Sequence, residues 1–213
     1  MRIYLIRHGR QSDSRCNVDV GLSEEGVQQA RLTGKRLSTW SLTSLVASDM
    51  IRARQTAEHI NASLHVPLTI VPALRELNFG QMEGLTTSEI DTRFVEFQAA
   101  QLRIDRDVHY PGGESISDVI ERVVPELEHI ANSGADRIGI ITHGVVIRAV
   151  VTYVLGAPPQ RWRVIGRRFE NCGITELDVD AVTGEMSLER VNDYAHLEKH
   201  PELLREAWGV REN

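Results

Sequence analysis

Residues 2–10 read RIYLIRHGR, and residues 137–145 read RIGIITHGV. Each stretch is an apolar run that ends on a histidine followed by a glycine, at His8 and at His143. A short run of aliphatic residues without helical spacing is typical of a central strand that is covered on both faces. Polar side chains are costly to bury, so two strands that end in the same way indicate a functional site.

Strand and helix signals alternate along the rest of the chain. The further predicted strands are residues 44–47, 67–71, 174–179 and 186–191, the last two as a terminal hairpin. Helices are predicted to start at Ser23, Ser48, Thr86 and Ser115, with one more over residues 145–155. The helix from Thr86 is expected to run towards Phe97.

This alternation predicts an α/β fold with three layers, α/β/α, around a mostly parallel central sheet. In such sheets ligands bind at the carboxyl ends of the strands. His8 and His143 each stand at such an end, so the fold is expected to bring them to the same edge of the sheet.

One of the predicted helices contains a proline. The helix that starts at Ser115 is expected to run to about Asn132, and Pro125 lies within it. An interior proline costs about 3 kcal/mol, because it removes a hydrogen bond and clashes with the preceding turn. We therefore expect a kink or two short helices at this point.

Length and composition indicate one globular domain. The chain has 213 residues, of which 41% are hydrophobic and 25% charged, and no linker rich in Gly, Ser or Pro divides it. We assign residues 1–213 to one domain, with residues 200–213 as a C-terminal tail. In that tail Leu203, Leu204 and Trp208 fall on one side of a short predicted helix, which can pack on its own domain or on the second subunit of a homodimer.

The composition also restricts location and partners. No apolar run reaches the length of about 18 residues that a membrane span needs, and Met1 leads directly into the first strand, so a cytoplasmic protein without a membrane partner is expected. The net charge of −6 argues against nucleic acid, which usually binds a surplus of Lys and Arg. Two cysteines, Cys16 and Cys172, are too few for a disulfide framework and are predicted to be reduced.

Arg7, His8, Arg52, Glu76 and His143 carry the groups that phosphoryl transfer needs, if their strand and helix ends converge. A neutral imidazole has a nucleophilic nitrogen that can accept a phosphoryl group. Guanidinium groups match phosphate oxygens with planar forks and stay charged. A carboxyl group kept protonated in a partly closed pocket can give a proton to the leaving alcohol and then activate water.

Five motifs in order resemble the histidine phosphatase superfamily, also called phosphoglycerate mutase-like. They are RHG at 7–9, SDMIRARQTA at 48–57, LRELNFGQMEG at 74–84, PGGES at 111–115 and ITHG at 141–144. A tripeptide alone is a weak signal, whereas five ordered motifs are a strong one. The resemblance extends from Arg2 to about Leu197.

The resemblance implies roles for particular residues. It implies that His8 is the phosphorylated nucleophile and that Glu76 acts as acid and base. The phosphate pocket that it implies consists of Arg7, Arg52 and His143, and we add Gly144 to the substrate-binding set. It also implies that the reaction needs no metal, and we predict no other cofactor.

The loop after RHG departs from the family pattern. The family often has Thr and Asn where this chain has Gln11 and Ser14. Ser12 and Asn17 are the available substitutes, and we assign Asn17 to the substrate-binding set.

Each of these residues also has a plain structural explanation. His8 and His143 can be hydrogen-bonded histidines at strand ends. Arg52 can pair with Asp49 at helical spacing, an interaction usually worth less than about 0.5 kcal/mol. Arg54, in the same predicted helix, is expected to be solvated. The five motifs together favour the functional interpretation.

The acid has two competitors in neighbouring loops, Glu83 and Glu114. Family placement favours Glu76, and Glu114 is expected to support the PGGES turn. The six remaining histidines lack metal-ligand spacing such as HExxH, so no metal site is predicted. Cys16 lies close to the pocket in sequence and is interpreted as incidental.

Three functions are consistent with the sequence. We favour a phosphatase that hydrolyses a small-molecule phosphomonoester through a phosphohistidine. A phosphoglycerate mutase must also hold a second charged group under a longer lid, whereas the segment from 84 to 111 offers only Arg93, Arg103 and Arg106 as bases. The third alternative is an inactive phosphate-binding module. Sugar phosphates, an α-ribazole phosphate-like compound and other small phosphomonoesters all stay open as substrates.

Overall fold

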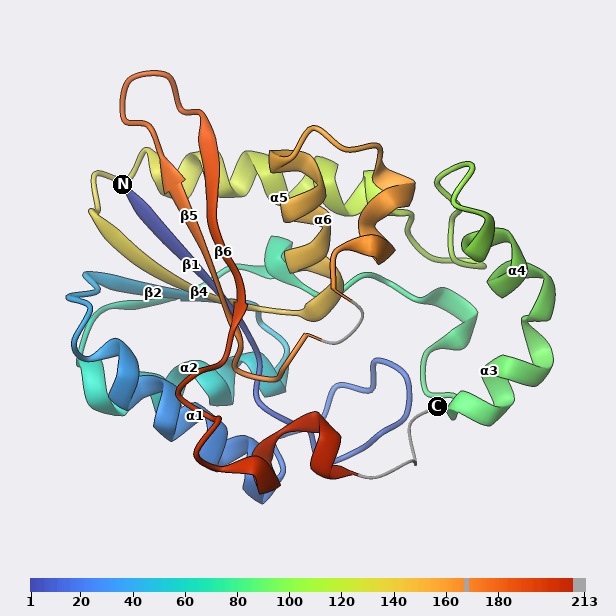
Figure 1. Ribbon diagram of the computed structural model, residues 1–213, viewed down its shortest axis with the longest axis horizontal. Coiled ribbons are helices and arrows are strands. Elements are labelled where there is room, and N and C mark those ends of the chain that lie inside the picture. The colour runs from blue at the N-terminus through green and yellow to red at the C-terminus, as the bar shows by residue number, and fades with distance from the viewer. Residues whose placement is uncertain (167–168, 209–213) are drawn as a thin grey trace.

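The computed structural model describes residues 1–166 and 169–208, and its strands form one sheet (Figure 1). The strands are β1 (Arg2–Arg7), β2 (Ser44–Ala47), β3 (Leu68–Ile70), β4 (Arg137–Thr142), β5 (Ile174–Val179) and β6 (Met186–Asp193). The α-helices are α1 (Glu24–Leu37), α2 (Ile51–Leu64), α3 (Thr87–Arg93), α4 (Val95–Arg103), α5 (Ile116–Ala131) and α6 (Gly144–Val154). The two stretches that opened the sequence analysis are thus β1 and β4, each followed by its histidine.

The sheet topology places those two strands side by side. The strand order is β3-β2-β4-β1-β5-β6, in which β1 to β4 run parallel and β5 pairs antiparallel with both β1 and β6. In the register of β1 with β4, Arg7 lies opposite Thr142. The next residues along these strands, His8 and His143, therefore leave the same edge of the sheet as neighbours.

The alternation of side chains along β1 explains its continuous apolar run. Ile3 and Leu5 belong to the core cluster shared with α5 and α6, and Tyr4 and Ile6 to the cluster shared with α1 and α2. All four side chains are buried, and each buried aliphatic group stabilises the fold by about 1.5–3 kcal/mol. The two helical layers lie on opposite faces of the sheet (Figure 1), which confirms the predicted three-layer fold.

The predicted helix caps are present with one exception. The Ser23 hydroxyl accepts a hydrogen bond from the Gly26 N–H, and Thr86 and Ser115 form capping boxes with residues three positions on. Helix α2 begins at Ile51 without a cap from its own N-cap side chain. Instead Asp19, from the loop after β1, accepts from the Ile51 N–H at 2.8 Å.

Two helical predictions were wrong in detail. Helix α5 is one continuous helix through Pro125 and not two short ones, and the proline lies on its exposed side. The helix expected from Thr86 towards Phe97 is divided, because the backbone of Phe94 leaves the helical region (φ −124°, ψ 32°). The division lets α3 and α4 each keep an apolar side chain against the core. Strand β3 is also shorter than its predicted range.

The C-terminal tail packs on its own domain. It forms two 3-10 turns, η4 (Pro201–Leu203) and η5 (Arg205–Trp208). Leu203 is buried, and its carbonyl accepts a hydrogen bond from the Gln29 side chain on α1 at 2.7 Å. The prediction for the Trp208 side chain and residues 209–213 lies outside the described residues.

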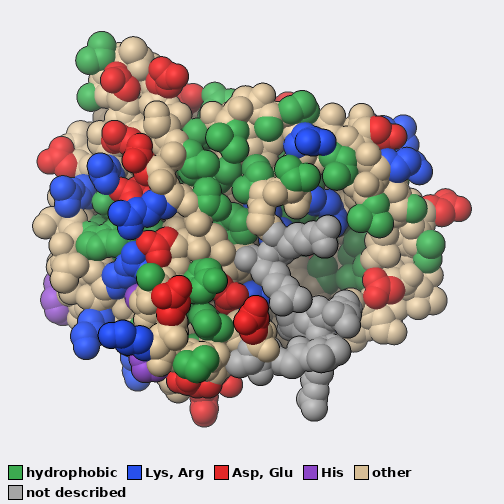
Figure 2. Space-filling model, viewed as in Figure 1, with side chains coloured by type: hydrophobic (Ala, Val, Ile, Leu, Met, Phe, Trp, Pro, Cys, Tyr) green, Lys and Arg blue, Asp and Glu red, His purple; other side chains and the backbone are tan. Residues whose placement is uncertain are grey.

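The surface carries charges of both signs. On the face in Figure 2, acidic and basic side chains alternate over the α1 side, while apolar side chains gather over α6. Within residues 1–166 and 169–208, none of the helices has the length and hydrophobicity to cross a bilayer. Cys16 and Cys172 are not joined by a disulfide.

Candidate active site

The two histidines face each other at the carboxyl edge of the sheet. Their ring centroids are 5.1 Å apart with the planes inclined by 54°, and both side chains are buried. The His8 Nδ1 lies 2.7 Å from the Gly9 carbonyl oxygen, which can only accept, so Nδ1 carries the proton. The Nε2 of His8 is therefore left with its lone pair. On His143, Nε2 lies 2.9 Å from the Ser48 hydroxyl.

The half-buried Arg7 and the buried Arg52 complete the positive side of the site. Arg7 donates to the Phe169 carbonyl, and Arg52 donates to the Asn17 side-chain oxygen at 2.7 Å and to the Val18 carbonyl at 3.0 Å. Within the described part of the chain, the Nε atoms of both arginines have no hydrogen-bond partner. Buried donors without partners are costly, so this arrangement favours binding of an acceptor-rich anion.

Burial and mutual repulsion set the charge states of this cluster. Burial, followed by the charge of Arg52, holds the pKa values of His8 and His143 well below 6.5. Burial also lowers the pKa of Arg7 to about 9, and its guanidinium still carries its charge at neutral pH. The site thus combines neutral imidazoles with guanidinium cations, the combination that suits a nucleophile attacking a bound anion.

Glu76 reaches the same site from the loop after η1 (Pro72–Leu74). One carboxylate oxygen accepts from the Leu77 N–H at 3.0 Å, and the other accepts from the Val145 N–H at 3.3 Å. Val145 lies in the first turn of α6, two residues after His143. The α6 N-terminus therefore fixes the carboxyl group beside the histidine pair.

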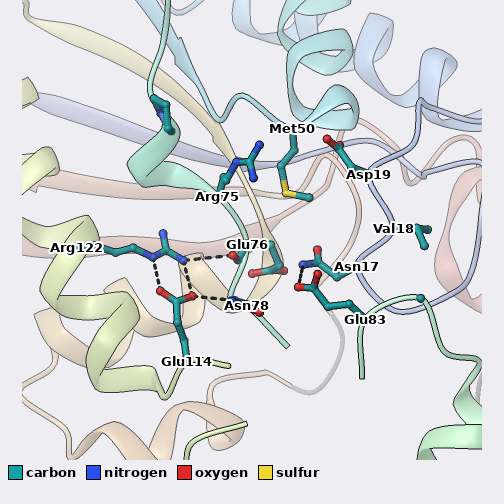
Figure 3. Close-up of a pocket in the computed structure, with 12 residues that line it drawn as sticks. Asn17, Val18, Asp19, Met50, Arg75, Glu76, Asn78, Glu83, Glu114 and Arg122 are labelled. Atoms are coloured by element: carbon teal, nitrogen blue, oxygen red, sulfur yellow. Dashed lines mark hydrogen bonds and ion pairs between the residues drawn. The ribbon is translucent and has the colours of Figure 1, made fainter. Parts of the chain in front are cut away.

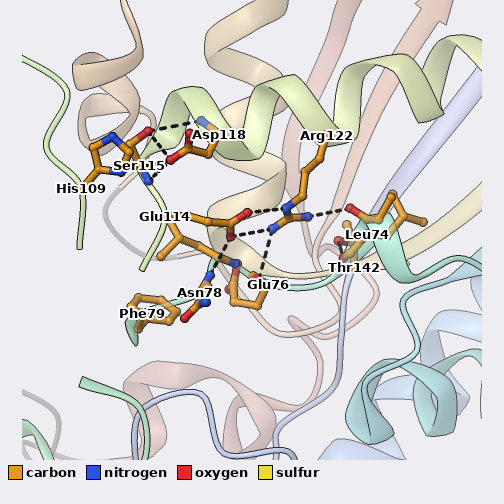
Figure 4. Close-up of polar contacts among 12 residues, drawn as sticks. Leu74, Glu76, Asn78, Phe79, His109, Glu114, Ser115, Asp118, Arg122 and Thr142 are labelled. Carbon is orange, nitrogen blue, oxygen red and sulfur yellow. Dashed lines mark hydrogen bonds and ion pairs between the residues drawn. The ribbon is translucent and has the colours of Figure 1, made fainter. Parts of the chain in front are cut away.

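A salt bridge that sequence reasoning missed holds the loop of Glu76 (Figure 4). Arg122 on α5 donates to Glu114 at 2.7 Å, to the Ala73 carbonyl at 2.6 Å and to the Glu76 carbonyl at 3.2 Å. Glu114 also accepts from the Asn78 N–H at 2.8 Å. Both oxygens of Glu114 thus support the loop of Glu76, whereas the sequence had placed this residue in support of the PGGES turn. Glu76 is the carboxyl group that lies beside the histidines.

Two cavities meet at Glu76. The larger, of about 810 Å³, is lined by Arg7, His8, Arg52 and Glu76, together with the loop after β1 and the start of α3. The other, of about 680 Å³, lies towards Arg122 and Glu83 (Figure 3) and shares Asn17 and Glu76 with the first. The larger cavity holds the candidate nucleophile, so it is the one in which a substrate would bind.

Comparison with known proteins identifies the family. The family model described as the histidine phosphatase superfamily (branch 1) matches residues 3–194. The chain belongs to this superfamily. The protein is similar to the "Probable phosphoglycerate mutase GpmB" of Erwinia tasmaniensis, with 29% identity over 213 residues that cover 93% of this chain and 95% of the relative.

Solved structures agree with the superfamily fold. A mycobacterial glucosyl-3-phosphoglycerate phosphatase superposes with a TM-score of 0.81 at 26% identity, covering 90% of this chain and 98% of that one. YhfR of Bacillus stearothermophilus gives a TM-score of 0.81 at 27% identity, with coverage of 92% and 99%. These likenesses extend over nearly the whole length of both chains.

Two further residues of the predicted substrate-binding set lie beside the arginines. The backbone of Asn17 is in the left-handed region (φ 48°), and its side-chain oxygen accepts a hydrogen bond from the Arg52 guanidinium. A Cβ on Gly144 would lie 3.4 Å from the Nε of Arg7, so glycine leaves room for that side chain. Arg52 does not pair with Asp49, which instead binds Arg75 at 2.6 Å.

Two hydroxyl groups inside the superfamily motif at 48–57 were not assigned from sequence. Ser48 contacts the ring of His143, and the Thr56 hydroxyl accepts from the Gly9 N–H at 2.9 Å. The motif itself was the signal that could have identified them, because both residues stand at fixed positions relative to Arg52 within it. They hold the two histidine-bearing strand ends in place.

Cys16 is another nucleophilic side chain that lines the larger cavity. Burial, reinforced by the charge of Glu83, raises the pKa of its thiol to about 11. A thiol that stays protonated at neutral pH is a poor nucleophile. His8 is therefore the better candidate, in agreement with the prediction that Cys16 is incidental.

Proposed function

We propose that the protein is a phosphomonoester hydrolase that acts on a small phosphorylated metabolite through a phosphohistidine intermediate. The observation that carries the proposal is the geometry of His8. Its Nδ1 is bound to a carbonyl, its Nε2 keeps a lone pair, and Arg7, Arg52 and His143 surround it. This arrangement offers one nucleophile and several fixed donors to one tetrahedral anion.

The first step transfers the phosphoryl group to the protein. The Nε2 lone pair of His8 attacks phosphorus, and the bond from phosphorus to the ester oxygen breaks. Arg7 and Arg52 stabilise the charge on the equatorial oxygens, as fixed cations do in phosphoryl transfer generally. The carboxyl group of Glu76 gives its proton to the departing oxygen, so the leaving group departs as an alcohol.

The second step regenerates the protein. The Glu76 carboxylate takes a proton from a water molecule as its oxygen attacks the phosphoryl group, and the bond from phosphorus to Nε2 breaks. Inorganic phosphate is released, His8 returns to its neutral form and Glu76 to its acid form. One water is consumed for each ester hydrolysed.

The surroundings of the site support hydrolysis over phosphoryl transfer within a sugar acid. The bases of the segment between Gly84 and Pro111, which are Arg93, Arg103 and Arg106, are all exposed and none lines either cavity. A mutase has to shield its phosphohistidine from water. The mycobacterial structural neighbour is named as a phosphatase and has been solved with inorganic phosphate.

The mutase alternative has its own support in the name of the Erwinia relative. The test compares phosphate release from p-nitrophenyl phosphate with isomerisation of 3-phosphoglycerate in the presence of 2,3-bisphosphoglycerate. We expect phosphate release with negligible isomerisation. Rapid isomerisation with little net phosphate release would contradict the proposal and favour a mutase.

Arg122 provides a test of how Glu76 is positioned. Arg122→Met removes the donors to the Ala73 and Glu76 carbonyls, so the acid should shift while the phosphate pocket stays intact. We expect kcat/KM for an alkyl phosphate such as glycerol 3-phosphate to fall by about 10- to 100-fold, since small displacements of catalytic groups cost that much. The loss for p-nitrophenyl phosphate, whose leaving group hardly needs a proton, should be several times smaller.

Two variants make this measurement specific. Arg122→Lys keeps one charged donor and should restore part of the activity towards glycerol 3-phosphate. Arg54→Met removes an exposed arginine from α2 and serves as the control. Equal losses on both substrates together with a lower melting temperature would mean that Arg122 only stabilises the fold.

A further inference from the structure

Glycine follows the candidate nucleophile because the first turn of α1 leaves no room for a side chain. A Cβ on Gly9 would clash with the Gly26 carbonyl oxygen at 2.6 Å. Glycine has more backbone freedom than any other residue. The chain is therefore least restrained by its own sequence directly beside His8. The imidazole depends on this stretch, since its Nδ1 donates to the Gly9 carbonyl.

Buried side chains hold both ends of the peptide unit between His8 and Gly9. The His8 carbonyl accepts from the Asn171 side chain at 2.8 Å, and the Gly9 N–H donates to the Thr56 hydroxyl at 2.9 Å. Asn171 is 2% exposed and Thr56 is 0% exposed. Because both polar groups of this peptide plane are bound, the plane cannot rotate without breaking a buried hydrogen bond.

A third buried side chain holds the next peptide unit, between Gly9 and Arg10. Its N–H donates to the Gln29 side-chain oxygen at 2.8 Å, and its carbonyl is the one that the imidazole of His8 binds. Gln29 lies on α1 and is fully buried. Three segments of the chain thus each contribute one side chain to the backbone around a single glycine. We refer to Gln29, Thr56 and Asn171 as the Gly9 clamp.

Asn171 reaches the His8 carbonyl from an irregular stretch of backbone before β5. The Cys172 N–H donates to the Arg7 carbonyl at 2.9 Å, and the Arg7 N–H donates to the Gly173 carbonyl at 3.1 Å, so two residues stand opposite one, as in a β-bulge. Cys172 is in the left-handed region (φ 60°), which a residue with a side chain rarely adopts. Bulges and sparsely populated backbone conformations concentrate at functional sites, where they aim a side chain. Here the side chain that precedes the bulge is that of Asn171.

The clamp determines which nitrogen of His8 carries the proton. A neutral imidazole has one N–H and one lone pair, and the hydrogen bond of one nitrogen sets the state of the other. With the Gly9 carbonyl in place, the proton stays on Nδ1 and Nε2 keeps its lone pair. If this carbonyl turned away, the proton would distribute between the two nitrogens. An imidazole that is protonated on Nε2 cannot attack phosphorus.

We propose that Asn171, Thr56 and Gln29 are positioning residues that keep the proton of His8 on Nδ1 and direct its Nε2 at the phosphoryl group. The inference rests on the proposed function, because it concerns the nucleophile of that reaction. Each of the three side chains acts through the backbone on either side of Gly9 and not through the substrate. Their loss should therefore affect all substrates alike, unlike the loss of Glu76.

The test removes one contact from each peptide unit. Asn171→Leu and Gln29→Met keep side chains of similar shape and lose the hydrogen bonds to the His8 carbonyl and the Arg10 N–H. We expect kcat/KM to fall about 10- to 100-fold, since small displacements of a reacting group cost that much. The factor should be the same for p-nitrophenyl phosphate and glycerol 3-phosphate. The Kd for inorganic phosphate should change by less than about twofold, because the cations of the phosphate pocket remain.

A spectroscopic measurement separates positioning from stabilisation of the fold. ¹⁵N NMR of the imidazole nitrogens, assigned with His8→Ala, shows which nitrogen of His8 carries the proton. The wild-type protein should show it on Nδ1, and both variants should show a mixture of tautomers or protonation of Nε2. Gln29→Met also releases the Leu203 carbonyl, whereas Asn171→Leu leaves that contact intact, so a change common to both variants comes from the clamp.

Asn61→Leu is the matched control. The Asn61 side chain donates to the Val66 carbonyl at 2.9 Å, at the end of α2 far from Arg52. Its loss should lower the melting temperature without changing the rate or the tautomer of His8. Should Asn171→Leu fail to fold, Thr56→Val, which removes the acceptor of the Gly9 N–H, takes its place.

The inference and the proposed function can fail separately. A wild-type His8 with its proton on Nε2, or folded variants that keep both the wild-type tautomer and the wild-type rate, would overturn the inference. A loss of phosphate affinity as large as the loss of rate would also overturn it, because the side chains would then act on the phosphate pocket. If the wild-type protein hydrolyses nothing, the proposed function fails, and a displaced proton in Asn171→Leu still supports the clamp.

Discussion

Replacing His8 by alanine is expected to lower the rate of phosphate release by about four orders of magnitude or more, the effect of removing a catalytic nucleophile. We expect no other described side chain of the cavity to take over. The second imidazole, on His143, is fully buried with its Nε2 against the Ser48 hydroxyl, and burial keeps the Cys16 thiol protonated. The affinity for inorganic phosphate should change much less, because Arg7 and Arg52 remain.

The measurement is acid-quench or base-quench labelling with a ³²P-labelled phosphomonoester. The wild-type protein should carry a phosphoryl group that is stable in base and lost in acid, and the His8→Ala protein should carry none. The control is His129→Ala, which removes an exposed histidine from α5. A wild-type protein that binds phosphate but never becomes labelled would instead be a phosphate-binding module, and label that persists in His8→Ala would assign the nucleophile elsewhere.

The fold was predictable where local signals were strong. The apolar runs of β1 and β4, the hydroxyl caps at Ser23 and Ser115 and the turn before β6 each act within a few residues. The errors came where tertiary contacts override local preference. Helix α5 continues through Pro125 because its apolar face packs on the core both before and after the proline. The helix from Thr86 divides at Phe94, and Ile90 and Phe97 then both pack against the core.

The candidate site also has a part that local signals predicted and a part that they did not. Short ordered motifs placed Arg7, His8, Arg52, Glu76 and His143 in one set. The structure brings the first four to one cavity and places the buried ring of His143 next to that of His8. The supporting contacts could not be predicted, because they join segments without a local signal. Arg122 reaches a carbonyl 49 positions away, and Asp19 caps a helix 32 positions further on. Asn171 donates to the His8 carbonyl from 163 positions further along the chain.

Glu76→Gln should distinguish substrates by their leaving groups. The amide keeps an oxygen that can accept from the Val145 or Leu77 N–H, so the loop should keep its shape. It cannot donate a catalytic proton, and general acids contribute about 10²- to 10⁴-fold. We expect a loss of that size in kcat/KM for glycerol 3-phosphate, and a loss of less than about tenfold for p-nitrophenyl phosphate, because nitrophenolate leaves without protonation.

The same variant separates the acid from the base role of Glu76. If the carboxylate also activates water, the phosphohistidine of Glu76→Gln should form at nearly the normal rate from p-nitrophenyl phosphate and then hydrolyse slowly. Stopped-flow absorbance would show this as a burst of nitrophenolate equal to one equivalent of protein, followed by slow turnover. Glu121→Gln, an exposed carboxylate on α5, is the control. Equal losses in kcat/KM on both substrates would remove Glu76 from the acid role, and slow turnover without a burst would remove it from the base role.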